Sequence, residues 1–242
     1  MEKAPINLAN MLLFSLTPLL AVILVPLYGY LDGYDLYEWL VFLGMMLFCG
    51  LSITAGYHRM WSHKAYKGHP FLRLIFALGG ACALQNDVMH WASDHRRHHR
   101  HVDQNDLDPY SAGRGFWFSH IGWILRHYDS GKEDFSNIKD IQQDKVALWQ
   151  HQHYLLLVLL TNIALPAFLG FLHGDIIACL LLGGLLRLVM SQHVTYLINS
   201  IAHMWGKQTY SDASSARDNP LLALITYGEE ASPGSHFESS NI

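Results

Sequence analysis

The chain has 242 residues, of which 51% are hydrophobic and only 15% are charged. Soluble domains carry roughly 25% charged residues, so the composition argues against an ordinary soluble enzyme. The net charge of −4 leaves no overall basic surface, which excludes nucleic acid as a partner. Histidine is unusually frequent: the 16 histidines equal all Lys and Arg residues together.

The first predicted elements are two apolar helices. Residues 7–31 contain no charge, and at about 1.5 Å per residue they exceed the ~30 Å hydrocarbon core of a bilayer. The run is too long for the apolar part of a signal peptide and has no cleavage site, so it predicts a retained membrane span. Residues 39–57 are again uncharged and predict a second span.

The middle of the chain is more polar. Residues 71–91 are apolar but interrupted by Arg73 and Asp87, which favours an interfacial or partly buried helix over a fifth span. Residues 130–145 are polar and are expected to be exposed.

Two further spans follow, at residues 154–173 and 176–200, and Arg187 is the only Lys, Arg, Asp or Glu in them. The sequence therefore predicts an all-α integral membrane protein with four transmembrane helices in two hairpins. Cys49, Cys82 and Cys179 show no paired spacing and are expected to be buried free thiols.

The basic residues predict the orientation in the membrane. Residues 58–153 hold 12 of the 16 Lys and Arg, whereas the two short connections carry acids and no base. We therefore expect both termini and a helical, His-rich cap at 58–153 to be cytoplasmic, in the endoplasmic reticulum or a bacterial inner membrane. A single domain is expected over 1–228, followed by a divergent polar tail at 229–242.

Eight of the histidines lie between His58 and His101. His95, His98 and His99 stand at i, i+3 and i+4, so their imidazoles share one helical face. His58 and His63 are five apart, which is about 140° around a straight α-helix. These two would therefore reach one site only from a helix end or by flanking it. Asn199 and His203 are four apart where the fourth span ends.

These histidines predict a metal site. Closed zinc sites usually include cysteine, and none is near, while six histidines on three segments exceed the needs of one ion. A nitrogen-rich site for two metal ions fits best, and imidazole suits iron. Lipid headgroup contact would explain Arg100 and His101 but not three histidines on one face. Ordinary interfacial roles are expected for His69, His120, His127, His151, His153, His173 and His193.

Four motifs resemble membrane fatty-acyl desaturases of the stearoyl-CoA desaturase type. GYHRMWSH at 56–63 is similar to the first histidine box of that family. QND at 85–87 with WASDHRRHH at 91–99 is similar to the second box and its leader. RGFWFSHIGW at 114–123 and NSIAH at 199–203 match two further family stretches.

The resemblance implies a di-iron site that uses O2 to remove two hydrogens from a long-chain fatty acyl-CoA, a step of fatty acid biosynthesis that acts at carbon nine in this family. It implies an electron donor, a cytochrome b-type or ferredoxin protein with its reductase. Iron ligands would be His58, His63, His95, His98, His99 and His203, with Asn199 binding through a water. Substrate contacts would come from Asn10, Asn86, Trp91, Asp94, Arg126 and Tyr196.

The chain departs from the family pattern in three places. Ser93 stands where relatives often have arginine, and Tyr196 where they often have tryptophan. The family continues past Gly228 with a third box, His-Asn-x-His-His, whereas this chain has a Ser/Gly/Pro-rich segment with His236 alone. We therefore expect a truncated, frame-shifted or shortened form that binds iron poorly and has little desaturase activity.

Three other functions stay open from the sequence. One is a fatty-acyl or lipid hydroxylase of the same superfamily, whose product would be an alcohol instead of an alkene. Another is a non-enzymatic metal-binding or metal-transporting membrane protein. The third is an inactive protein that pairs with an intact homologue.

Overall fold

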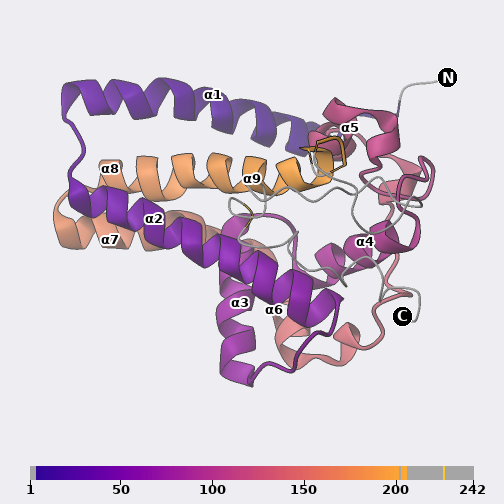
Figure 1. Ribbon diagram of the computed structural model, residues 1–242. Helices are drawn as coiled ribbons and strands as arrows, with labels where there is room; N and C mark the ends of the chain where they lie inside the picture. The colour runs from indigo at the N-terminus through magenta and orange to yellow at the C-terminus, as the bar shows by residue number, and fades with distance from the viewer. Residues whose placement is uncertain (1–3, 202, 206–225, 227–242) are drawn as a thin grey trace.

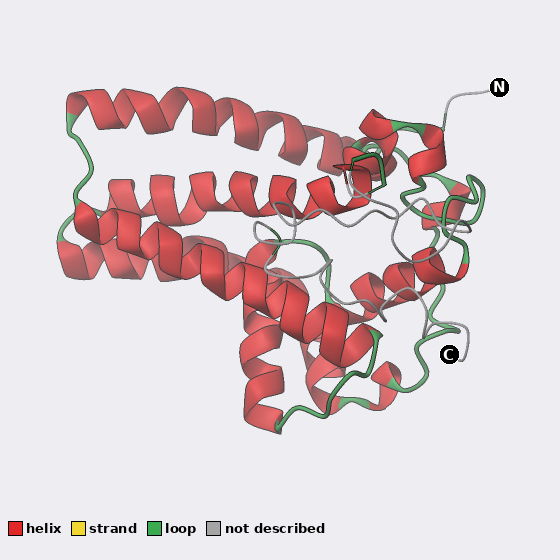
Figure 2. Ribbon diagram, viewed as in Figure 1, coloured by secondary structure: helices red, strands yellow, loops and turns green. Residues whose placement is uncertain are grey.

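The computed structural model describes residues 4–201, 203–205 and 226 (Figure 1). Across this part of the chain the regular elements are all helices, and the one β-type contact is an isolated bridge between Ile6 and Arg126 (Figure 2). The prediction of an all-α protein is confirmed.

Four helices in the described part are long and apolar enough to cross a membrane, as predicted. The first is α1, Leu8–Leu31. The second, Leu36–Ser62, combines α2 (Leu36–Leu51) with the π-helix η1 (Ser52–Ser62). The third, Lys145–His173, is built from α6 (Lys145–Leu159), η6 (Leu160–Ala164) and α7 (Leu165–His173). The fourth, Ile176–Ile201, is built from α8 (Ile176–Cys179), η7 (Leu180–Leu186) and α9 (Arg187–Ile201).

The predicted bounds of the second and third spans were too short. The uncharged runs mark what lipid can cover, but a helix continues until a capping residue or a break ends it. Asp144 caps the third span by accepting from the backbone N–H of Val146 at 2.9 Å, and it stands ten residues before Tyr154, where the charge-free run begins.

The four spans form a bundle with two distinct ends. The short connections after α1 and after α7 lie together at one end, and the His-rich region lies at the other (Figure 1). At the connection end, the Tyr28 hydroxyl donates to Asp175 at 2.7 Å and His173 Nε2 lies 2.9 Å from Asp35 Oδ2. These contacts fasten the two hairpins to each other.

The segment expected as one interfacial or partly buried helix is instead two helices. α3 (Pro70–Ala83) and α4 (Val88–Arg100) are bent by 81° relative to each other. Leu84 and Asn86 adopt left-handed backbone conformations in the turn, with φ of 53° and 70°. Such residues end an α-helix, and Asp87 then caps the next one through its Oδ1.

Short elements complete the His-rich end: η2 (Ala112–Arg114), α5 (Phe116–His120), η3 (Gly122–Ile124), η4 (Asp129–Gly131) and η5 (Ile141–Gln143). The expectation that 130–145 is exposed was partly wrong, because Ile138 and Ile141 are buried in the hydrophobic core. Two apolar side chains in a polar segment are enough to anchor it.

Buried polar side chains join the elements. Gln150 is fully buried, donates to the Tyr57 hydroxyl and to the Ala77 carbonyl, both at 2.6 Å, and accepts from Val88 N–H at 2.9 Å. It therefore holds α6 to the second span, α3 and the start of α4. Cys49, Cys82 and Cys179 are buried and free, as predicted.

Candidate metal centre

Four of the predicted ligand histidines converge. His58, His63, His95 and His99 each contribute one ring nitrogen to the group, and these four nitrogens all lie within 4.8 Å of one another. His95 Nε2 is 2.9 Å from both His63 Nε2 and His99 Nε2. The first two residues come from η1 and its C-cap and the other two from α4, so this four-histidine cluster bridges two elements.

His58 and His63 meet because the second span changes its helical form. The N–H of His63 donates to the carbonyl of His58 at 3.0 Å, the five-residue spacing of a π-helix. That wider turn places residues five apart on one side, and the two imidazole centroids are 4.5 Å apart. The 140° separation of a straight α-helix therefore does not apply here, and the two imidazoles meet at the end of the second span.

His98 and His203 form a second pair beside the cluster. Their ring centroids are 5.6 Å apart, and His98 is also 5.6 Å from His99. His98 Nδ1 lies 2.8 Å from Asp108 Oδ1, which directs its Nε2 away from the carboxylate. Ligating histidines commonly contact a carboxylate through the other ring nitrogen in this way.

Asp108 was missed by the sequence reasoning. It is fully buried and also accepts from the backbone N–H groups of Asp103 at 3.0 Å and Tyr110 at 3.1 Å. The only signal in the sequence was an Asp-Pro dipeptide in a loop after the second box, where no histidine spacing draws attention to it. Asn199 lies half-buried in the last turn of α9, four residues before His203.

The environment favours the neutral form of the His95 imidazole. Burial, followed by the repulsion of His99, His58 and His63, holds the pKa of His95 well below its usual value. Neutral imidazole is the form that binds metals. The indole of Trp91 stacks on His95 with centroids 4.7 Å apart, which fixes the ring orientation.

Arg96 fixes α4 against the end of the second span. Its guanidinium donates to the carbonyls of Trp61 and Ser62 at 2.8 and 3.0 Å and forms two hydrogen bonds with Asp140 at 2.8 and 3.0 Å. Burial alone would raise the pKa of Asp140, but the hydrogen bonds and charge of Arg96, with Lys64 nearby, lower it to about 2. The carboxylate therefore stays ionised at neutral pH.

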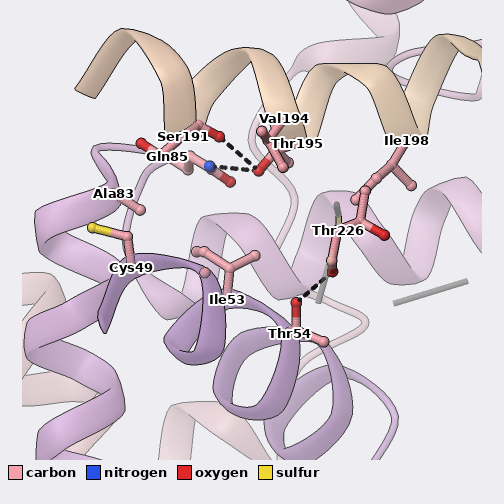
Figure 3. A pocket seen from close by; sticks show the side chains of 11 residues that line it. Cys49, Ile53, Thr54, Ala83, Gln85, Ser191, Val194, Thr195, Ile198 and Thr226 are labelled. Atoms are coloured by element: carbon pink, nitrogen blue, oxygen red, sulfur yellow. Dashed lines mark hydrogen bonds between the residues drawn. The ribbon is translucent and has the colours of Figure 1, made fainter. Parts of the chain in front are cut away.

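An apolar pocket lies between the second span and α9 (Figure 3). At one side, Gln85 Nε2 donates to Thr195 Oγ1 at 2.8 Å, joining the turn before α4 to the fourth span. Gln85 was part of a recognised motif but was not predicted as a site residue. The pocket is lined by Cys49, Gly50, Ile53, Thr54, Ala83, Gln85, Ser191, Val194, Thr195, Ile198 and Thr226.

The predicted substrate residues are only partly brought together. Asn10 Nδ2 donates to the Ile124 carbonyl at 2.9 Å and Arg126 donates to the Ala4 carbonyl at 2.7 Å, so both lie in one seam between the start of α1 and the 124–127 segment. Asp94 instead pairs with Arg97 at 2.6 Å on α4.

The remaining predicted substrate residues lie at other points. Asn86 is exposed in the turn before α4, and Trp91 contacts the histidine cluster through His95. Tyr196 is buried in α9, with its ring 6.0 Å from that of Phe14 and 5.9 Å from that of His120.

The donor set fits metal ions. Six imidazoles form a group of four and an adjoining pair, and the pair carries a carboxylate behind His98. One ion does not need six nitrogen ligands, so this set fits two ions. Nitrogen-rich donors suit iron among the first-row metals. His236 of the predicted tail lies outside the described residues.

Comparison with known proteins gives a consistent family. The fatty acid desaturase family matches residues 37–231. The chain is 39% identical over 183 residues to a probable acyl-CoA desaturase of Schizosaccharomyces pombe, covering 75% of this chain and 38% of the relative. It is 40% identical over 181 residues to acyl-CoA desaturase 1 of Saccharomyces cerevisiae, covering 74% and 35%.

A mammalian relative aligns over more of the chain. Stearoyl-CoA desaturase 4 of Mus musculus is 36% identical over 228 residues, covering 92% of this chain and 63% of the relative. The chain thus spans less than two thirds of the length of each of these relatives. Together, the histidine geometry and the matched residues show that the chain belongs to the fatty acid desaturase family and is of its stearoyl-CoA desaturase type.

Proposed function

We propose that this chain carries the histidine-box centre of an O2-dependent fatty acyl-CoA desaturase, acting in fatty acid biosynthesis with the double bond introduced at carbon nine. The observation that carries the proposal is the convergence of six imidazoles from the end of the second span, α4 and residue 203. In the proposal two iron ions are held by His58, His63, His95, His98, His99 and His203, with Asn199 binding through a water.

The bond that reacts, an unactivated C–H bond of the acyl chain, determines the type of reaction. An unactivated C–H bond offers no acidic proton, so side chains alone have no acid–base route to break it. When bound, the iron pair would supply the oxidising power by activating O2. The protein's own part is to hold the acyl chain in place and to exclude water.

Named residues take the holding roles in this proposal. The pocket beside Gln85 and Thr195 provides apolar walls for an acyl chain, and Trp91 would shape the acyl tunnel where its indole stacks on His95. Asn10, Asn86, Asp94 and Arg126 would meet the coenzyme A end, and Tyr196 would shape the acyl tunnel. Asn10 and Arg126 lie in the same seam between the start of α1 and residues 124–127, which supports a shared role at the coenzyme A end for these two residues.

The electron donor would approach the His-rich end of the bundle. We propose that this end and both termini are cytoplasmic, because basic residues concentrate there and the opposite connections are acidic. The exposed Lys64 and Lys67, close to the first box, would attract the acidic surface of a cytochrome b-type or ferredoxin partner.

The test measures iron and product together. The chain is purified in detergent, supplied with iron, reductant, a donor protein, O2 and stearoyl-CoA, and the acyl products are separated by gas chromatography and mass spectrometry. Because the chain spans only part of its relatives, the same assay is run on a version in which residues 229–242 are replaced by a segment carrying His-Asn-x-His-His. The extended version is expected to bind two irons and form an alkene, and the chain alone to bind less iron.

Three outcomes would overturn the proposal. An alcohol product would identify a hydroxylase. Full iron loading of the extended version without any acyl oxidation would favour a metal-binding membrane protein. Unchanged alkene formation in an H95Q variant would remove the histidine cluster from the reaction, with H153Q, at an exposed histidine outside the cluster, as the matched control.

A further inference from the structure

A second group of possible metal ligands lies outside the histidine-box centre. Asp87 caps the start of α4, His90 lies in the first turn of that helix, and His151 lies on α6. One ligand atom from each lies within 4.8 Å of the other two. His90 and His95 are five residues apart on a regular α-helix, about 140° around it, so α4 presents the two histidines on different faces.

Asp87 presents its second carboxylate oxygen to both imidazoles, and that oxygen is already hydrogen-bonded to His90 Nδ1. Its Oδ1 accepts the capping hydrogen bonds from the N–H groups of Met89 and His90 at 2.9 and 3.2 Å. Its Oδ2 faces the other way, 2.6 Å from His90 Nδ1 and 3.1 Å from His151 Nδ1. The Asp87 side chain is only 6% exposed, so its second oxygen is held in place among the two rings.

The other ring nitrogen of His90 is already oriented. Its Nε2 lies 2.8 Å from Glu133 Oε2. A carboxylate on the far nitrogen is the usual support of a metal-binding histidine, because it fixes the tautomer and turns the other nitrogen's lone pair toward the ion. The ring of Phe135 packs edge-on against both His90 and His151, at 4.9 and 5.9 Å, and forms an apolar wall.

His151 supplies a buried nitrogen whose contact with Asp87 is long and poorly aligned. Among the residues that the structure describes, its Nδ1 has no hydrogen-bond partner, although the Asp87 oxygen is 3.1 Å away. The contact with Asp87 is therefore poorly aligned and leaves this buried nitrogen only weakly satisfied. A cation between the three atoms would satisfy it.

We propose that Asp87, His90 and His151 bind a divalent transition metal ion, with Zn²⁺ the best match, at a site separate from the histidine-box centre. Two imidazoles and one carboxylate form a known zinc donor set that leaves one position for water. Tetrahedral ligands about 2.0–2.1 Å from zinc lie about 3.3 Å from each other. The present separations of 2.6 and 3.1 Å require small widening only.

The site would join α4 to α6. Because α4 carries three of the box histidines, an ion here would hold the start of that helix against the third span. The side chains of His90 and His151 are 28% and 33% exposed, so an ion can enter from solvent. The inference shares no residue with the proposed iron set, so it stands or fails independently of the proposed function.

Zinc binding by the full chain tests this. The detergent-purified protein is stripped with a chelator, equilibrated with Zn²⁺ and analysed for bound metal per chain, and Co²⁺ absorption reports the donor type. H151Q and D87N are each expected to lose one equivalent relative to wild type, whereas H153Q, two residues away and exposed, keeps it. Asn caps helices as well as Asp does, so D87N keeps the start of α4.

Two further variants make the result decisive. E133Q keeps the three ligands but weakens the support of His90, so zinc affinity is expected to fall about 10–100-fold. The double variant H95Q/H99Q is expected to retain the equivalent that H151Q loses. Equal zinc content in H151Q and H153Q, with unchanged circular dichroism, would overturn the proposal. The proposal would also be overturned if only H95Q/H99Q, and not H151Q, lost the zinc equivalent assigned to Asp87, His90 and His151.

Discussion

Arg187 is the only Lys, Arg, Asp or Glu within the last two predicted spans, and its burial makes a strong prediction possible. The side chain is fully buried, with Nη1 donating to the Cys82 carbonyl at 2.6 Å and Nη2 donating to Asn162 Oδ1 at 2.8 Å. Cys82 lies in the last turn of α3, where carbonyls have no helical donor. Arg187 therefore caps α3 from another helix.

Replacing Arg187 with Met keeps the volume and removes the donors to the Cys82 carbonyl and to Asn162, which lie on other helices. It also removes the hydrogen bond from Nε to the Gly183 carbonyl four residues earlier in its own helix. Each buried acceptor left without a donor costs about 1–3 kcal/mol, so two acceptors cost about 2–6 kcal/mol. Removing the charge also removes the desolvation cost of burying it, which favours the folded state. Deleting one member of a buried polar network nevertheless usually destabilises the protein, because the remaining members lose their partner. We therefore expect the free energy of unfolding to fall by about 2–5 kcal/mol.

The assay is reversible unfolding of the detergent-solubilised protein by increasing SDS, followed by tryptophan fluorescence and circular dichroism. R187K keeps the charge but offers a single ammonium to two acceptors, so it is expected to fall between wild type and R187M. K139M, which removes an exposed cation, should change stability by less than about 0.5 kcal/mol. An R187M protein as stable as wild type would refute the reasoning.

Three further predictions concern other sites. Gly80→Ala is expected to lower the free energy of unfolding by about 1–3 kcal/mol, because an added Cβ would lie only 2.2 Å from the buried ring of Tyr57; chemical unfolding measures it. Asp108→Asn, which weakens the support of His98, is expected to reduce the affinity of the histidine-box centre for iron or Co²⁺ about 10–100-fold, measured by metal titration. The pKa of Asp140 in the folded protein is lowered from its ordinary 3.8 to about 2, so the ionised carboxylate stabilises the fold above pH about 4 and this stabilisation is lost as the pH falls toward 2. The difference in melting temperature between wild type and D140N should therefore shrink between pH about 4 and pH about 2.

Each of these has its own control. Gly44→Ala, where an added Cβ meets nothing within 4 Å, should be neutral or slightly stabilising, and an equal loss at both glycines would contradict the packing argument. D106N removes an exposed carboxylate near Asp108 and should leave metal affinity unchanged. For Asp140, a difference in melting temperature that persists unchanged to pH 2 would contradict the lowered pKa.

The sequence by itself determined the membrane architecture. A long uncharged apolar run is stable as a helix inside a bilayer and would expose a large apolar surface in water. The number and order of the spans therefore follow from where such runs lie along the sequence. The same-face arrangement of His95, His98 and His99 also follows from local spacing, because helical periodicity is a property of the backbone. His95 and His99 accordingly meet at 2.9 Å.

The tertiary structure decided which distant residues meet. His63 joins His58 only because the second span becomes a π-helix, a change that residue spacing does not reveal. Asp108 reaches His98 through a loop, and Gln85 reaches Thr195 across 110 positions.

The same holds for the proposed zinc site. His151 looked like an ordinary interfacial histidine, yet α6 packs on α4 and brings it to Asp87, 64 positions earlier in the chain. Hydrophobic pattern and helical periodicity are local and can be read along the chain. Partnerships between side chains depend on helix packing, turn geometry and departures from the α-helix, and these are set by the whole fold.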